Sequence, residues 1–258
     1  MVDSHVDDLS VQAVPEKSFE NSVGMKMVRI NKGYWIGAHE VTERQFGALM
    51  GLEAMPELPR IAAGRPSRQP SLDSDYPVRY ISAADALRFC AQLTASDHEA
   101  GLLPEGAAYS LPTERQWVQC VADIKFWQEV TAASIIKLSK DKNCYKDLRR
   151  GPLQQPSTVG SKQPNRLGLF DMMGNVSEFC LDWYSTSGPA PSRVIRGTDY
   201  SDLRAEYWCV SNRYGIGGPR SPTIGFRVVL APRKTKGTPR PRKSSDSAPD
   251  APDPPPIN

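Results

Sequence analysis

The stretch FDMMGNVSEFCLDWY, residues 170–184, constrains the fold of this chain more than any other. It is apolar at both ends, yet its middle carries Asp171, Gly174, Asn175 and Glu178. Burial of a carboxylate in such apolar surroundings costs free energy unless the charge is compensated. The two carboxylates flank a tight turn, so the pattern predicts that a positive charge lies between them.

The composition places the net charge of the chain outside its globular part. The 258 residues carry a formal net charge of +3. Residues 232–258 contain six Lys or Arg and three Asp, which accounts for the whole excess. The rest is neutral and gives no electrostatic signal for a specific nucleic-acid partner. The tail is rich in Pro and Ser, and we expect it to be disordered and solvated, or to act as a weak basic anchor.

The length of 258 residues allows one large domain or two small ones. We expect no membrane span, because no run of about 18 apolar residues is present. The N-terminus is polar and acidic and lacks the basic and apolar regions of a signal peptide. We therefore expect a cytoplasmic protein with a polar arm at 1–17 and a disordered tail at 232–258, on either side of the folded part.

Three expected helices begin with the same capping pattern. In each, a Ser or Thr is followed three residues later by Gln or Asp and then by an amphipathic run. The pairs are Thr42/Gln45, Ser82/Asp85 and Thr113/Gln116. A fourth helix is expected at 125–138, and short strands at 25–30, 33–37 and 226–232. Gly, Pro, Ser and Asn are dense between 140 and 232, which predicts much irregular backbone there.

The cysteines and histidines do not form a recognisable metal-binding pattern. The five cysteines are Cys90, Cys120, Cys144, Cys180 and Cys209. Their odd number and the lack of a CxxC pair argue against a zinc cluster and against a fully paired disulfide framework. Cys90, Cys120 and Cys180 have apolar neighbours, so we expect buried thiols. The three histidines are scattered without the spacing of metal ligands.

Six sequence blocks occur in an order that identifies a family. They are NSVGMKMVRINKGYWIGAHEVTERQF, YPVRYISAADALRFCAQL, GLLPEGAAYSLPTERQWVQCVA, VGSKQPNRLGLFDMMGNVSEFCLDWY, RGTDY and GFRVVL. From about residue 18 to 231 the chain resembles the formylglycine-generating enzyme, or sulfatase-modifying factor, family. The resemblance implies a single α+β domain with a variant C-type-lectin-like fold, short sheets, a few amphipathic helices and much coil.

The catalytic pattern of that family is not matched. Its best-known activity oxidises a sulfatase cysteine to formylglycine, with copper held by two thiolates. Counted forward from Arg196, the two thiol positions fall on Asp202 and Tyr207, and counted back from GFR the second falls on Arg204. Copper(I) prefers soft sulfur ligands, and Cys209 is the single thiol in this stretch. We therefore expect neither copper nor oxidase activity, with Cys209 as the candidate if a displaced site exists.

The calcium loop of the family is matched better. The resemblance implies ligands from the side chains of Asp171 and Glu178 and from the carbonyls of Gly174 and Val176. This agrees with the preference of calcium for six to eight carboxylate and carbonyl oxygens. We expect structural calcium here. The alternative is that the two carboxylates accept backbone hydrogen bonds or pair with an arginine.

The region 199–214 combines aromatic and charged residues, as binding surfaces do. We expect a monomeric binding module whose partner is an unidentified protein or small molecule. One alternative is a formylglycine-generating oxidoreductase, or a related oxidase with a displaced site around Cys209. Another is that part of the region, above all Trp208 and Tyr200, belongs to the core. The candidate ligand-binding residues are Asp199, Tyr200, Asp202, Arg204, Tyr207, Trp208, Arg213 and Tyr214.

Overall fold

The structure is a computed structural model of the whole chain. It describes residues 17–30, 33–55, 69–122, 155–187, 190–202, 207–216 and 220–232. The expected helix at 125–138 lies outside these ranges, as do the N-terminal arm and the tail apart from Lys17 and Pro232.

The three capped helices form where the sequence predicts them. They are α1 (Glu43–Met50), α2 (Ala83–Glu99) and α3 (Glu114–Cys120), and a short 3-10 helix, η1 (Leu52–Ala54), follows α1. Each N-cap side chain accepts a hydrogen bond from the backbone N–H three residues on, and that residue's side chain accepts one from the N-cap N–H. This reciprocal box satisfies backbone donors that a helix start otherwise leaves without partners, so the prediction of three capping boxes is confirmed.

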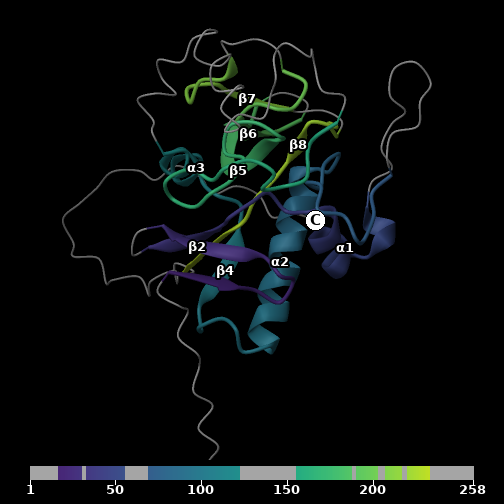
Figure 1. The fold of residues 1–258 in the computed structure, drawn as a ribbon, viewed down its shortest axis with the longest axis vertical. Coiled ribbons are helices and arrows are strands. Elements are labelled where there is room, and N and C mark those ends of the chain that lie inside the picture. The colour runs from purple at the N-terminus through teal and green to yellow at the C-terminus, as the bar shows by residue number, and fades with distance from the viewer. Residues whose placement is uncertain are drawn as a thin grey trace, which may run out of the picture.

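The larger sheet has five antiparallel strands in the order β1-β2-β3-β9-β4 (Figure 1). Its strands are β1 (Ser18–Glu20), β2 (Lys26–Ile30), β3 (Tyr34–Gly37), β4 (Ala107–Ser110) and β9 (Val229–Pro232). The expected strands at 25–30 and 33–37 pair with each other, and the strand expected at 226–232 forms over its last four residues. The two ends of the folded chain thus share one sheet.

A second sheet of four strands lies above the first in Figure 1, in the order β7-β6-β5-β8. Its strands are β5 (Ser177–Ser185), β6 (Ser192–Arg196), β7 (Arg213–Gly215) and β8 (Ile224–Gly225), and only the β5–β8 pair is parallel. Strand β5 begins inside the stretch FDMMGNVSEFCLDWY. Sequence analysis did not predict this strand, because the stretch mixes buried polar and apolar residues without a clean alternation.

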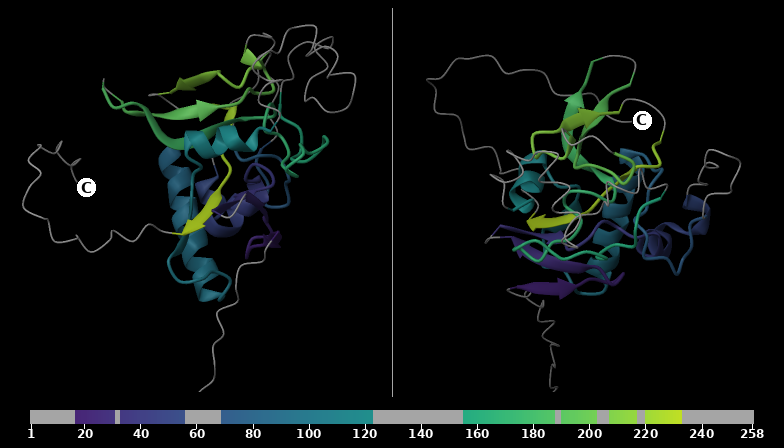
Figure 2. Two further views of the ribbon diagram at one scale, coloured as in Figure 1. Left: turned by 90° about the vertical axis from the view of Figure 1, so that its left-hand side faces the viewer. Right: turned by 45° about the horizontal axis from the view of Figure 1, so that its top comes forward.

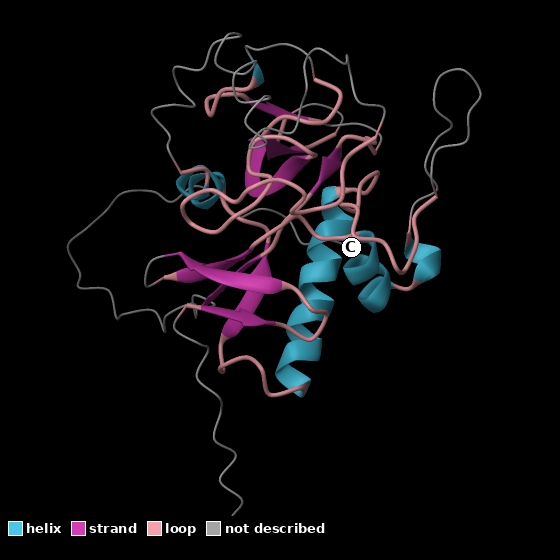
Figure 3. Cartoon of the chain, in the orientation of Figure 1, coloured by secondary structure: helices cyan, strands magenta, loops and turns pink. Residues whose placement is uncertain are grey.

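Two apolar clusters hold these layers together in a single α+β domain. One packs α1 and α2 with both sheets and includes the stacked rings of Phe46 and Phe89, with Phe226 edge-on to both. The other packs α3 with β3, β6 and β9. Loops make up much of the remaining chain (Figure 3). Figure 2 shows the C-terminal segment, in yellow, running from the four-stranded sheet to the five-stranded sheet. Arg227 lies in this crossing, between β8 and β9.

Candidate functional site

Glu178, near the start of β5, has a positive partner from within the chain. Its side chain is 1% exposed. The guanidinium of Arg227 donates to both carboxylate oxygens, with Nη2 at 2.6 Å from Oε1 and Nε at 2.8 Å from Oε2. The indole Nε1 of Trp117, on α3, donates to Oε2 at 2.8 Å. A buried charge with this many charge-assisted hydrogen bonds is well compensated.

Arg227 also connects the crossing segment to neighbouring backbone. Its guanidinium donates to the carbonyl oxygens of Gly37 at 3.1 Å and Phe170 at 3.0 Å. Burial by itself lowers the pKa of an arginine, but Glu178 reverses this and raises the pKa of Arg227 above its ordinary value. Arg227 therefore stays charged, and it joins the end of β3, the segment before the turn and the start of β5.

Asp171 opens the turn that precedes β5. It adopts the left-handed backbone conformation, with φ of 65°, which Asp tolerates better than most residues. Its Oδ2 accepts a hydrogen bond from the N–H of Gly160 at 2.8 Å, whereas its Oδ1 is buried and has no hydrogen-bond partner in the described structure. Burial raises the pKa of Asp171 to about 6.

Glu40 is a second buried carboxylate beside Asp171, and sequence analysis did not single it out. It is 1% exposed, and neither of its side-chain oxygens has a hydrogen-bond partner in the part of the chain that the structure describes. Burial, followed by the negative charge of Asp171, raises the pKa of Glu40 well above its ordinary value. The two side chains influence each other directly, because a proton on Glu40 allows it to donate to Asp171.

The predicted calcium ligands therefore have different surroundings. Gly174 and Val176 lie in the turn between the two predicted carboxylates, as expected. Glu178 pairs with an arginine, which is the alternative that the sequence left open. Among the described ranges, no group of three or more His, Cys, Asp or Glu side chains is placed to hold a metal ion. Calcium binding by Asp171, Gly174, Val176 and Glu178 remains a prediction. Of the two carboxylates in this set, Asp171 has an oxygen without a hydrogen-bond partner among the described residues.

A cavity of about 310 Å³ opens beside the four-stranded sheet, in the region predicted to bind a ligand. Its lining residues are Ser177, Gly197, Asp199, Asp202, Tyr207, Asn212 and Tyr214. Asp202 and Tyr207 are the two positions that the forward count assigns to the family's thiols. The fold thus brings both positions into one cavity, together with two more of the predicted residues.

Hydrogen bonds between residues close in sequence hold the loops that line this cavity. Oδ1 of Asp199 accepts from the N–H of Ser201 at 2.8 Å, and Nδ2 of Asn212 donates to the carbonyl of Tyr207 at 3.1 Å. Burial raises the pKa of Tyr214 to about 12, despite the opposing effect of a hydrogen bond with Ser177. The Tyr214 phenol is therefore neutral at physiological pH. We refer to this cavity as the acidic pocket.

Four of the predicted ligand-binding residues do not line the acidic pocket. Tyr200 is 6% exposed and Trp208 is fully buried, so both belong to the core. Arg213 is exposed, but its guanidinium faces Glu114, with Nε at 2.7 Å from Oε1. Arg204 lies outside the described residues. Sequence analysis missed Ser177, Gly197 and Asn212, which reach the pocket through strand pairing and loop packing.

The thiols that the structure describes are not gathered around the acidic pocket. Cys209 is partly exposed, and its Sγ lies 3.0 Å from Oγ of Ser211. Cys90, Cys120 and Cys180 are buried, as predicted, and burial raises the pKa of each. Cys144 lies outside the described residues. None of the four described thiols lines the acidic pocket.

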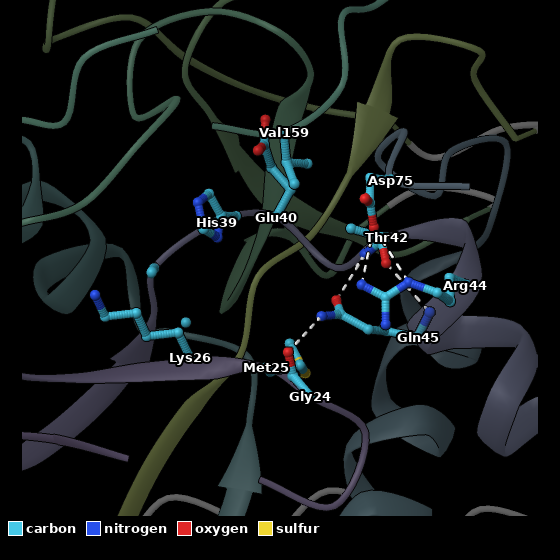
Figure 4. A pocket seen from close by; sticks show the side chains of 12 residues that line it. Gly24, Met25, Lys26, His39, Glu40, Thr42, Arg44, Gln45, Asp75 and Val159 are labelled. Carbon is cyan, nitrogen blue, oxygen red and sulfur yellow. Dashed lines mark hydrogen bonds and ion pairs between the residues drawn. The ribbon is translucent and has the colours of Figure 1, made fainter. Parts of the chain in front are cut away.

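A second cavity, of about 240 Å³, lies between β3, the start of α1 and the segment around residue 159 (Figure 4). Its lining includes Gly37, His39, Glu40, Thr42, Asp75 and Val159. Figure 4 shows the carboxylate of Glu40 beside Val159, apart from the hydrogen-bonded group around Gln45. Burial, with a further effect of Arg227, lowers the pKa of His39 to about 4, so His39 is neutral at pH 7. We refer to this cavity as the Glu40 cavity.

A family model for the sulfatase-modifying factor enzyme 1-like domain matches residues 9–232. The chain belongs to this family. The match covers both sheets, the three helices and both cavities, so the fold expected from the resemblance is confirmed at the level of a single mixed helix-and-sheet domain.

Curated relatives share only part of this sulfatase-modifying factor domain. A serine/threonine-protein kinase pkn1 from Chlamydia pneumoniae is 37% identical over 88 residues, which are 28% of this chain and 14% of the relative. The Pkn1 of Chlamydia trachomatis serovar L2 is 29% identical over 134 residues, which are 46% of this chain and 20% of the relative. The chain therefore spans a small fraction of those proteins, and their kinase designation describes the whole relatives.

Solved structures share the fold of the domain over most of its length. PvdO from Pseudomonas aeruginosa aligns with a TM-score of 0.59 at 18% identity, covering 85% of this chain and 100% of PvdO. Treponema denticola variable protein 1 aligns with a TM-score of 0.56 at 22% identity, covering 84% and 94%. CarF aligns with a TM-score of 0.53 at 20% identity, covering 83% and 96%. Likeness at these identities establishes the fold.

The described residues also bear on membrane association. None of the helices in the described ranges is both long enough and apolar enough to cross a membrane.

Proposed function

We propose that this sulfatase-modifying factor domain is a non-catalytic binding module, and that its acidic pocket holds a positively charged group of the ligand. The observation that carries the proposal is the joint placement of Asp202 and Tyr207 in one cavity. These are the positions at which the forward count expects two thiols, so a carboxylate and a phenol stand where soft metal ligands are expected. Hard oxygen groups disfavour copper(I) and favour a hydrogen-bonding or ionic ligand.

The chemistry of the wall specifies the ligand class. Two carboxylates, Asp199 and Asp202, line the acidic pocket, and no Lys or Arg among the described residues does. Tyr207 and Tyr214 add aromatic rings, which attract cations through their faces. The volume of about 310 Å³ is at the lower end of small-molecule sites. A guanidinium or ammonium group, from an arginine or lysine side chain or a free amine, fits this combination.

The comparison with solved structures supports a recognition role. One fold neighbour is named a variable protein. A scaffold that accommodates variable sequence suits a domain whose recognition residues lie in loops rather than in the core. In this chain the pocket residues Asp199, Asp202 and Asn212 lie in loops between the strands of the smaller sheet, where substitution changes the ligand without changing the fold.

Binding of two matched small molecules tests the proposal. Nα-acetylarginine amide carries the guanidinium, and Nα-acetylcitrulline amide has nearly the same shape without the charge. Titration of the full chain, followed by calorimetry and by NMR, should show binding of the arginine compound only. Asp202→Asn should weaken this binding by about tenfold, the equivalent of about 1.4 kcal/mol, because it removes one charge and little volume.

Asp73→Asn serves as the matched control, because Asp73 is exposed and does not line the acidic pocket. It should leave the affinity for the arginine compound unchanged. Equal binding of the arginine and citrulline compounds, or an equal loss in Asp73→Asn and Asp202→Asn, would contradict a cation-binding pocket.

The oxidase remains a second candidate because Cys209 is the one partly exposed thiol among the described cysteines. Its test is incubation of a Cys-x-Pro-x-Arg peptide with the chain, oxygen and copper, followed by mass spectrometry. We expect no conversion of the thiol to an aldehyde, since the described cysteines other than Cys209 are buried and cannot complete a two-thiolate site. Conversion that Cys209→Ser abolishes would establish the oxidase and overturn the binding-module proposal.

A further inference from the structure

A third cavity, of about 390 Å³, opens between the start of α2 and the four-stranded sheet. Its larger apolar lining residues are Ile81, Leu87, Phe179, Trp183 and Ile216. Ile81 and Phe179 are almost fully buried and belong to the larger apolar cluster, so the cavity reaches down to the core. Its volume lies in the range of small-molecule sites. We refer to it as the Trp183 cavity.

Two side chains that line the Trp183 cavity expose apolar surface to solvent. Trp183 is 50% exposed and Ile216 is 37% exposed. The described residues include four exposed large apolar side chains, and these two share one cavity. Single apolar side chains on a surface are ordinary, whereas a pair of them beside an apolar cavity favours binding of an apolar group.

Arginine supplies the charged part of the lining. Arg193 and Arg220 line the Trp183 cavity, and no Asp or Glu among the described residues does. The Arg193 guanidinium lies over the Trp183 ring, 3.7 Å from its centroid, because β5 and β6 pair these two residues directly. Its Nη1 donates to the carbonyl of Leu181. The stacked guanidinium is therefore held in place, and its other two nitrogens make no hydrogen bond among the described residues.

The carboxylates near these arginines do not neutralise them. Nη2 of Arg220 donates to Oδ2 of Asp85 at 2.8 Å, and its side chain remains 44% exposed. Asp85 also pairs with Arg88, so two arginines share its charge. Asp182 influences Arg193, but its carboxylate accepts a hydrogen bond from the start of α3 and does not line the cavity. An excess of positive charge therefore remains on this face.

The start of α2 adds to the attraction for an anion. Ala83 and Ala84, the first two residues of the helix, are part of the lining. The first N–H groups of a helix have no partner within it and form the positive end of its dipole.

We propose that the Trp183 cavity binds a small organic carboxylate with an apolar body, such as an aromatic or branched aliphatic acid. The apolar body packs over Ile81 and Phe179, and the carboxylate accepts hydrogen bonds from Arg220 and Arg193. This cavity shares no lining residue with the acidic pocket, and it attracts the opposite charge. The inference thus goes beyond the proposed function and does not depend on it.

Two probes of matched shape test the proposal. Naphthylacetate and naphthylacetamide share the ring system and differ in charge. Titration of the full chain with each, followed by NMR, should shift the indole N–H signal of Trp183, which Trp183→Phe identifies by its loss. We expect naphthylacetate to bind about tenfold more tightly than the amide, because hydrogen bonds from arginine to a carboxylate are charge-assisted.

Three variants locate the two parts of the site. Arg220→Gln should weaken naphthylacetate binding about tenfold and leave amide binding unchanged. Arg88→Gln is the matched control, because Arg88 pairs with the same Asp85 but does not line the cavity. It should bind both probes as the wild type does. Ala84→Met places a longer side chain at an exposed lining position of α2 and should weaken binding of both probes.

Three results would overturn the proposal. One is equal affinity of the wild type for the two probes, and another is the lack of a saturable Trp183 shift up to about 10 mM. The third is an equal loss of naphthylacetate binding in Arg88→Gln and Arg220→Gln. The comparison of the two probes on the wild type decides the first two points even if a variant does not fold. Because these probes carry no cationic group, their failure leaves the acidic pocket untouched.

Discussion

Glu178 and Glu40 are equally buried, at 1% exposure each, but their partners differ completely. Glu178 accepts hydrogen bonds from Arg227 and Trp117, which come from two other elements of the fold. Glu40 has no hydrogen-bond partner among the described residues for either oxygen. Both belong to the same charged group around the crossing of β8 and β9, because each influences Arg227.

The difference shows two ways in which a fold can tolerate a buried carboxylate. The charge of Glu178 is compensated from within the chain, and the compensation connects the two sheets. Glu40 has no such donor among the described residues, and its burial beside Asp171 raises its pKa, which favours the protonated and uncharged form. The ion pair of Glu178 and Arg227 holds parts of the fold together without any added solute. A buried carboxylate without such a partner makes the stability of the fold depend on solution conditions such as pH.

The largest loss of folding stability is expected when Glu178, like Glu40, is left without an arginine partner. Arg227→Met removes the guanidinium and leaves the buried Glu178 carboxylate with Trp117 as its one side-chain donor among the described residues. Loss of one partner from a buried ion pair typically costs about 3–5 kcal/mol. We expect the free energy of unfolding, measured in urea, to fall by about this amount.

The double variant Glu178→Gln with Arg227→Met is the control for that experiment. It removes the unpaired charge as well, so it should recover part of the lost stability. If the single and double variants were equally unstable, the loss would reflect the packing of Arg227 and not the charge it leaves behind.

A smaller loss of folding stability is expected when the second hydrogen-bond donor to Glu178, the indole N–H of Trp117, is removed. Trp117→Phe keeps an aromatic ring in the core but removes the indole N–H, which donates to Oε2 at 2.8 Å. A hydrogen bond to a charged group contributes about 1.5–3 kcal/mol, and we expect a loss at the lower end because Arg227 remains. Urea unfolding gives the value. An unchanged stability would mean that Arg227 alone compensates the carboxylate.

The smallest effect at neutral pH concerns His39, which lies next to Glu40 in the chain, and this effect grows as the pH falls. Burial lowers its pKa from 6.5 to about 4, so the unfolded chain binds this proton more readily than the folded chain. The stability that neutral His39 contributes is therefore fully present above about pH 6.5 and is lost as the pH falls toward 4.

The His39→Gln variant isolates this contribution, because the two carboxylates of Glu40 and Asp171 titrate in both proteins. Urea unfolding of wild type and variant at pH 7 and at pH 4.5 gives two stability differences. We expect wild type to lose more stability than the variant between these pH values. The same loss in both proteins would show that the proton on His39 does not couple to folding.

Much of the framework could be predicted from short sequence patterns. The capping boxes at Thr42, Ser82 and Thr113 each depend on two side chains three residues apart, so the local sequence contains the whole interaction. The hairpin of β2 and β3 follows from two nearby strand-like runs. The family also follows from the order of sequence blocks, and the match over residues 9–232 agrees with it.

The partners in the candidate sites could not be predicted in the same way. Arg227 and Trp117 lie 49 and 61 residues away from Glu178 in the chain. Arg227 interrupts the apolar run GFRVVL, which is a sign of a buried arginine, but the run does not say which carboxylate it meets. Likewise, the acidic pocket combines Ser177 from β5 with residues that follow β6 and precede β7.

The sequence by itself determined that the middle of FDMMGNVSEFCLDWY needs positive charge, because buried carboxylates cannot remain uncompensated. It also determined the helix starts, because their interactions are local. Only the tertiary structure decided how the charges are distributed, because the crossing between the two sheets brings Arg227 to Glu178 and the end of β3 brings Glu40 to Asp171. The compensation of a buried charge depends on groups within a few ångströms, and in this chain those groups come from distant parts of the sequence.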